Sequence, residues 1–86
     1  MSFLSNTLLK LGVNPENLIG GNKITLYDGK GIFIEGHNGI FSYEPNQIIV
    51  KLKKENLSVE GKGLKIIEIN KDELYIVGKI IKIERI

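Results

Sequence analysis

From Ile24 onward, apolar residues alternate with polar ones, and clusters rich in glycine, asparagine or aspartate interrupt this alternation again and again. A period of two is typical of strands that bury one face, and the interrupting residues are those that tight turns require. The expected strands lie near residues 24–28, 31–35, 40–43, 47–53, 56–60, 63–69, 73–77 and 79–85. The fold class is therefore predicted to be all-β: an antiparallel meander of about eight short strands, as a two-layer sandwich or partly open barrel, with a β-solenoid less favoured.

The first residues follow a different period. Phe3, Leu4, Leu8 and Leu11 recur at helical spacing, and Gly12 stands where a helix often ends. We expect an N-terminal amphipathic helix over 1–13, a connector over 14–23 and a single β domain over 24–86. The helix could cap an open face of the sheet, lie on a membrane or dock on a partner, and its sparse charge favours packing on the sheet.

Three stretches share the pattern apolar-x-apolar-x-Gly, with a further apolar residue three or four positions after the glycine: "IFIEGHNGI", "LSVEGKGL" and "LYIVGKII". Each predicts a strand, a turn or bulge at Gly36, Gly61 or Gly78, and a return strand. Gly39 closes the first of these turns. The sequence thus predicts consecutive hairpins, one of which has Glu35, Gly36, His37 and Gly39 at its tip.

The alternation also separates two faces. The predicted inward set is Ile24, Leu26, Ile32, Ile34, Val50, Leu52, Leu57, Val59, Leu64, Ile66, Leu74 and Ile76, with Ile48 leading into its strand. The opposite face carries more large apolar groups than a face in water should. Tyr27, Phe33, Tyr75 and Val77 on that face form a candidate interaction surface, covered by the helix, by a second layer or by another subunit.

The last strand, "GKIIKIERI", could pair through its edge with another chain, although its charged residues guard against uncontrolled pairing. We therefore expect a homo-oligomer.

Composition limits the chemistry. The chain has 86 residues, no cysteine, one histidine and a net charge of +2 with lysine and glutamate interleaved. Thiol chemistry and thiolate metal sites are excluded. No apolar run approaches the roughly 20 residues of a membrane span, no secretory signal is recognisable, and the cytoplasm is the expected location. We expect no catalytic residue, no cofactor, no metal site and no small-molecule substrate.

His37 is the one residue whose side chain suggests a reactive site. Glu35 shares its face if the extended backbone continues to residue 37, so a hydrogen bond between them is conceivable. The alternatives are a polar turn residue bonded to the local backbone, a contact to a partner, and a catalytic base. The turn is favoured because Gly36 and Gly39 supply the positive φ that turns need.

Four ordered segments resemble the YabP/YqfC family of small sporulation proteins of endospore-forming bacteria. The matching positions are Ile24, Thr25 and Leu26; Ile34, Glu35, His37, Gly39 and Ile40; Gly61, Leu64 and Ile66; and Leu74, Ile76, Gly78, Ile80 and Ile83. Gly36 stands where asparagine is usual in that family, and Asn38 where arginine or lysine is common.

The resemblance implies a non-enzymatic role in spore formation, in the cytoplasm of the mother cell or at the periphery of the forespore envelope, with a membrane protein of that envelope as a partner. The hypothesis is a structural or interaction protein that assembles with itself or with such a partner. The alternative is a small β-barrel that binds nucleic acid, with Phe33, Phe41 and Tyr43 stacking bases near Lys30 and Lys51. Glu35, Glu44 and the modest net charge disfavour nucleic acid.

Overall fold

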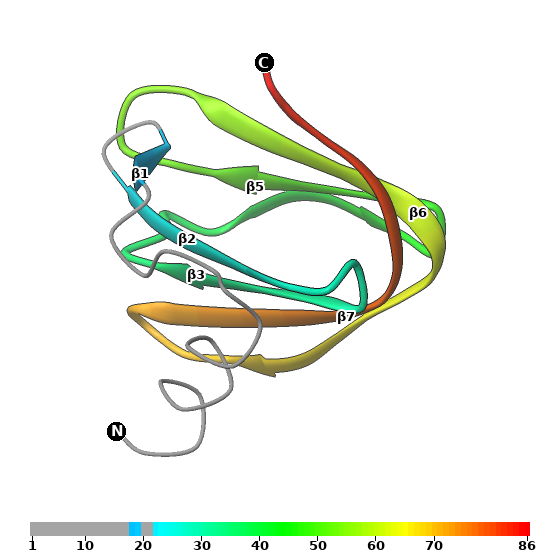
Figure 1. Ribbon diagram of the computed structural model, residues 1–86. Helices are drawn as coiled ribbons and strands as arrows, with labels where there is room; N and C mark the ends of the chain where they lie inside the picture. The colour runs from blue at the N-terminus through cyan, green and yellow to red at the C-terminus, as the bar shows by residue number, and fades with distance from the viewer. Residues whose placement is uncertain (1–17, 20–21) are drawn as a thin grey trace.

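The computed structural model describes residues 18–19 and 22–86, and in this part of the chain every regular element is a strand. The strands are β1 (Leu18–Ile19), β2 (Asn22–Tyr27), β3 (Gly31–Glu35), β4 (Ile40–Glu44), β5 (Gln47–Lys51), β6 (Asn56–Ile69) and β7 (Glu73–Arg85). All pairings are antiparallel, in the order β1-β2-β3-β7-β6-β5-β4 (Figure 1). The all-β class is confirmed.

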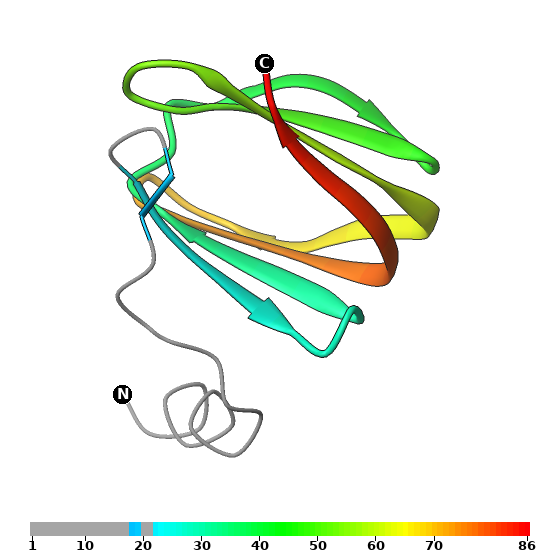
Figure 2. The same ribbon diagram turned by 45° about the horizontal axis from the view of Figure 1, so that its top comes forward.

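The predicted strand count is wrong, because four expected strands are two long ones. β6 and β7, of 14 and 13 residues, run through the glycines that were expected to turn the chain. Their hairpin bends in the middle, so each strand passes from one layer to the other (Figure 2). The bend interrupts the β6–β7 register between Glu60 and Gly61 and again between Lys62 and Lys65.

The result is one sheet folded into two facing layers. The β2 layer consists of β1, β2, β3, residues 73–77 of β7 and residues 65–69 of β6. The β5 layer consists of β4, β5, residues 56–60 of β6 and residues 80–85 of β7. The sheet order has two ends, at β1 and β4, so it is not a closed barrel. It is not a meander either, because β3 pairs with β7 and not with β4.

Gly61 and Gly78 are the residues that allow the bend. A Cβ atom at Gly61 would collide with the carbonyl oxygen of Lys79, and one at Gly78 would lie 2.7 Å from that of Gly63. Gly78 also has a φ of +137°, which side chains other than glycine rarely adopt. The backbones of β6 and β7 therefore approach so closely at the bend that only hydrogen fits between them.

The tips of the two shorter hairpins satisfy the backbone N–H groups that the bend leaves free. The turn after β2 accepts hydrogen bonds from Gly78 and Ile80, through the carbonyl oxygens of Lys30 (3.0 Å) and Gly29 (2.8 Å). The turn after β4 accepts in the same way from Gly61 and Leu64. Because unpaired buried N–H groups are costly, these bonds fix each hairpin tip against the bend.

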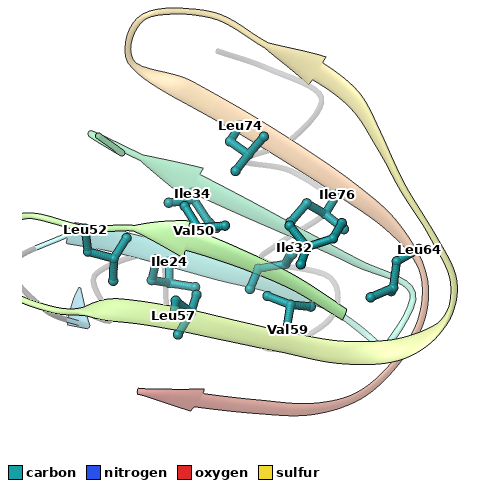
Figure 3. Close-up of a cluster of buried hydrophobic side chains, with 11 residues drawn as sticks. Ile24, Ile32, Ile34, Val50, Leu52, Leu57, Val59, Leu64, Leu74 and Ile76 are labelled. Atoms are coloured by element: carbon teal, nitrogen blue, oxygen red, sulfur yellow. The ribbon is translucent and has the colours of Figure 1, made fainter. Parts of the chain in front are cut away.

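The core lies between the layers and is aliphatic (Figure 3). Its buried members are Ile24, Ile32, Ile34, Ile48, Val50, Leu52, Leu57, Val59, Leu64, Leu74 and Ile76. Each of these belongs to the predicted inward set. Ile66 is only half-buried at the edge of this cluster, and Leu26 is half-buried as well.

The N-terminal helix expected over 1–13 lies outside the described residues. Part of the connector expected over 14–23 is in fact strand, because Leu18–Ile19 forms β1 and β2 begins at Asn22. The register pairs Leu18 with Lys23 and Ile19 with Asn22. Among the described residues, no helix could cross a membrane.

Candidate functional site

The segment 36–39 connects the two layers. It was expected to be a hairpin turn, but β3 belongs to the β2 layer and β4 to the β5 layer, and the two strands do not pair. Gly36 and Gly39 have φ values of +81° and +109°, which let the chain leave one layer and enter the other. The hairpin prediction is wrong because the residues that favour a tight turn also favour a crossing between layers.

His37 lies buried in this crossing, 8% exposed. Its Nε2 lies 2.8 Å from the carbonyl oxygen of Asn70, and the Gly39 N–H donates to its Nδ1 at 3.0 Å. A carbonyl can only accept and an amide N–H can only donate, so Nε2 carries the proton and Nδ1 is bare. Both ring nitrogens of the neutral imidazole are therefore engaged by the backbone.

Glu35 and His37 do not form the hydrogen bond that the sequence left open, since the histidine bonds to backbone groups. The Glu35 carboxylate lies 4.0 Å from the Lys23 ammonium on an exposed face. A general base needs a free nitrogen facing a substrate, and His37 offers none in this arrangement. No group of three or more histidine, aspartate or glutamate side chains within residues 18–19 and 22–86 could hold a metal ion.

Asn22 holds the same crossing from the other side. Its side chain is 1% exposed. Its Nδ2 donates to the carbonyl oxygens of Glu35 and Gly36, and its Oδ1 accepts from the Lys53 N–H at 3.0 Å. One amide thus joins the start of β2, the end of β3 and the loop after β5, with three of its four hydrogen-bonding positions used.

Asn70 shapes the turn between β6 and β7 that receives the histidine. Its Oδ1 accepts from the backbone N–H groups of Asp72 and Glu73, at 3.0 and 2.8 Å. The carbonyl of Asp72 in turn accepts the N–H of Gly36. The turn is therefore bonded to the crossing at two points, through His37 and through Gly36.

These segments surround a shallow depression of about 540 Å³. Its lining residues are Gly36, His37, Asn38, Gly39, Lys53, Ile69, Asn70, Lys71 and Asp72. Lys53, Lys71 and Asp72 are exposed, so their charges face water. The depression presents backbone and solvated charge, with no nucleophile, which suits a structural joint or a contact surface better than a reaction site.

The aromatic cluster Tyr27, Phe33 and Tyr75 lies on the opposite side of the β2 layer from the core. Phe33 and Tyr75 are directly opposite each other in the β3–β7 register, and their rings meet edge to face with centroids 5.9 Å apart. Tyr27 lies against Tyr75 at 5.6 Å. Edge-to-face and tilted pairs of this kind add stability beyond the area that they bury.

This candidate interaction surface is less exposed than the sequence predicts. Phe33 and Tyr27 are 6% and 7% exposed, whereas Tyr75 and Val77 are half-buried. That the surface meets a partner stays a prediction, and only Tyr75 and Val77 offer accessible area for it. Burial raises the pKa of the Tyr27 hydroxyl above its ordinary value, and the neighbouring Tyr75 adds to this effect.

The remaining sequence-predicted positions, Gly61 and Gly78, lie at the bend of the β6–β7 hairpin and away from the depression. The sequence prediction missed Asn22 and Asn70. Asn22 lies in the segment predicted to be the connector, and Asn70 lies in a predicted turn. A single asparagine carries no periodic signal, so only the fold shows that these two side chains converge on one crossing.

The comparisons with known proteins bear on this arrangement. A sequence model of the YabP family matches residues 20–84. The chain belongs to the YabP family. No curated protein and no solved structure matched it.

Asn22, His37 and Asn70, together with the crossing 36–39, form a polar joint between the layers. The span shared with the YabP family includes all of this joint. It begins before Asn22 and contains His37, Asn70 and the bend at Gly61 and Gly78. It excludes residues 1–19, and with them the predicted N-terminal helix. The resemblance stated from the sequence is therefore confirmed over the β domain.

Proposed function

We propose that this YabP-family protein is a non-enzymatic structural or interaction protein of bacterial endospore formation. It acts in the mother-cell cytoplasm, by assembling with itself or by binding a protein of the spore envelope. The observation that carries the proposal is the family match over residues 20–84. A second observation supports it: the histidine within the matched span has both ring nitrogens bonded to the backbone.

The test is deletion of the gene in the endospore-forming bacterium that carries it, followed by a count of heat-resistant spores. We expect the count to fall on deletion and to recover when the wild-type gene is restored. A deletion strain that grows normally and forms heat-resistant spores at the wild-type frequency would overturn the sporulation role.

The aromatic surface is tested in the same strain. Tyr75→Lys places a charge on the half-buried part of the surface, and Glu68→Gln on the neighbouring strand changes the net charge by the same amount. If the surface binds a partner, Tyr75→Lys lowers the spore count and Glu68→Gln does not, while both purified variants melt cooperatively. Phe33 is unsuitable for this experiment, since a charge at a side chain 6% exposed would unfold the sheet.

One observation favours nucleic-acid binding as a second candidate. Phe41 and Tyr43 on β4 are 64% and 52% exposed, and the Lys51 ammonium lies 5.9 Å from the centre of the Phe41 ring. Exposed aromatic rings beside lysine can stack bases and attract phosphates. The carboxylate of Glu44, on the same edge strand, would repel phosphates and so disfavours nucleic-acid binding.

The second candidate is tested by fluorescence anisotropy of a labelled single-stranded oligonucleotide, at low and at physiological salt. Binding that weakens with salt and is lost in Phe41→Ala would favour it. No binding at low salt would remove it.

A further inference from the structure

The second half of β7 is an open edge of the sheet. β3 pairs with β7 only over residues 73–77, whereas β6 continues beside β7 as far as Arg85. Within the part of the chain that the structure describes, no strand pairs with the other side of residues 81–85, whereas the Ile80 N–H on that side already donates to the carbonyl oxygen of Gly29. This side therefore presents backbone groups to solvent, as an edge strand does.

The pairing with β6 shows which backbone groups face outward. Asn56 and Ile86 exchange both of their backbone hydrogen bonds. In an antiparallel ladder such pairs recur at every second residue, so Glu84 and Lys82 also point their N–H and C=O groups toward β6. The N–H and C=O groups of Ile83 and Arg85 consequently point to the open side.

The side chains along this edge alternate in charge. Lys82 and Glu84 lie on the same face, with Nζ and Oε1 3.4 Å apart, and both are about half exposed (57% and 49%). Ile83 lies between them and packs against the core. Ile81 and Ile86 are 60% and 55% exposed, which leaves apolar area at both ends of the edge.

We propose that two copies of the chain pair through this edge, antiparallel, about a two-fold axis at Ile83. In this register the outward N–H and C=O of Ile83 in each copy bond to those of Ile83 in the other. Lys82 of each copy lies directly opposite Glu84 of the other, so two cross-strand ion pairs form. The two sheets become continuous through their β5 layers.

The charges select this register over its neighbours. A two-fold at Lys82 would place lysine opposite lysine, and one at Glu84 would place glutamate opposite glutamate. Like charges directly opposite each other in a sheet are destabilising. Of these three axes, only the one at Ile83 places opposite charges across from each other. The edge therefore favours this register over a shift of one residue in either direction.

The proposal rests on the proposed function in one respect: it specifies the self-assembly that was one of the two routes given there. A two-fold pair occupies the 81–85 edge of both copies, so this contact by itself closes into a dimer and does not propagate into a fibre. The test is therefore arranged so that edge pairing is measured on the purified chain and the role in sporulation is measured separately.

The experiment is a charge-swap cycle read by light scattering on the purified full chain. The wild type is expected to be a dimer. Glu84→Lys places lysine opposite lysine at both ion pairs, and Lys82→Glu places glutamate opposite glutamate. From the usual strength of cross-strand pairs, we expect each variant to dissociate with a constant roughly tenfold to a hundredfold higher. Mixing the two variants restores opposite charges at both positions, so the mixture should dimerise as tightly as the wild type, although each variant alone dimerises weakly.

The controls make the same changes of charge elsewhere. Glu68→Lys and Lys65→Glu lie on exposed positions of β6 in the β2 layer and should leave the dimer intact. Lys82 also faces Glu60 within the chain, so Lys82→Glu is checked by thermal melting, whereas Glu84 faces the neutral Ser58 and gives the cleaner variant.

A wild-type chain that stays monomeric at high concentration would overturn the proposal, as would single swaps that dimerise like the wild type. A mixture of the two variants that fails to dimerise would overturn the register. A Glu84→Lys strain that forms normal spores although its protein is monomeric would instead remove self-assembly from the proposed function and leave the edge pairing standing.

Discussion

Gly61 on β6 lies directly against the backbone carbonyl of Lys79 on β7, with no room for a methyl group between them. The contact is between backbone atoms, so neither partner can rotate away as a side chain would. At this point the long hairpin leaves one layer of the sheet and enters the other. The whole two-layer arrangement therefore depends on a residue without a side chain at position 61.

Gly61→Ala should lower the free energy of unfolding by about 3 kcal/mol or more, since an added methyl forces backbone displacement. Gly63→Ala is the matched control: Gly63 has a φ of +61° but open space around it, so only conformational strain of about 1 kcal/mol is expected. Urea unfolding of both variants measures the difference. Equal losses would mean that the close approach at Gly61 is unimportant.

His37→Ala should lower the free energy of unfolding by about 2 kcal/mol, because it leaves the Gly39 N–H and the Asn70 carbonyl without their partner. Asn38→Ala removes only one long hydrogen bond, of 3.3 Å, from an exposed side chain and should cost well under about 1 kcal/mol. Long-range ¹H–¹⁵N NMR of the wild-type ring should show the proton on Nε2. A neutral ring protonated on Nδ1 would contradict the arrangement.

Asn22→Asp should be more harmful than Asn22→Ala. The aspartate would direct a carboxylate oxygen at the carbonyls of Glu35 and Gly36, where the amide now donates. We expect about 2 kcal/mol for alanine and about 3 kcal/mol or more for aspartate, from the cost of unmade bonds at a buried site. Thermal and urea unfolding of both variants measure which of them loses more stability. An aspartate variant as stable as the wild type would show that these bonds are weak.

Stability should fall at high pH through Tyr27. Burial raises the pKa of its hydroxyl above the ordinary value of 10.0, so the folded chain keeps a proton that the unfolded chain loses. By linkage, this contribution is fully present below about pH 10 and is lost as the pH rises above that value. Tyr27→Phe should flatten the decline, and ultraviolet titration should show one fewer tyrosine ionising at high pH in the folded protein. An unchanged pH profile in the variant would refute the assignment.

Tyr27→Phe also tests the hydroxyl itself at neutral pH. The Tyr27 hydroxyl is buried, and it has no hydrogen-bond partner among the described residues. Its removal should therefore be neutral or slightly stabilising, because no bond is lost. Tyr43→Phe is the contrast, since the Tyr43 hydroxyl accepts from the Ile66 N–H at 3.0 Å. Because that bond is exposed, its loss should cost about 0.5 kcal/mol.

The alternation of residues predicted the strands and the core well, because burial on one face of a sheet leaves a direct trace in the sequence. It could not predict how the strands are connected. "GKG" and "VGK" have the composition of hairpin turns, yet Gly61 and Gly78 lie within continuous strands. Glycine permits both a tight turn and a close contact between two backbones. The sequence around it does not distinguish the two cases, and only the packing of the neighbouring strands does.

The polar joint was predictable in part. The sequence singled out His37 and its two glycines but placed them at a hairpin tip. The partners of His37 and Gly36 are Asn70 and Asp72, more than 30 residues away along the chain. Pairings of that separation follow from the order of strands in the sheet, and the order was the part that local pattern could not supply.

The continuous hairpin of β6 and β7 has a consequence for synthesis of the chain. β3 pairs with β2 and β7, and β5 pairs with β4 and β6, so both shorter hairpins need the last 30 residues or so as a template. Isolated two-stranded hairpins are at best marginally stable in water. The segment from β2 to β5 should therefore leave the ribosome without lasting structure, and its folding should wait until β6 and β7 have been synthesised.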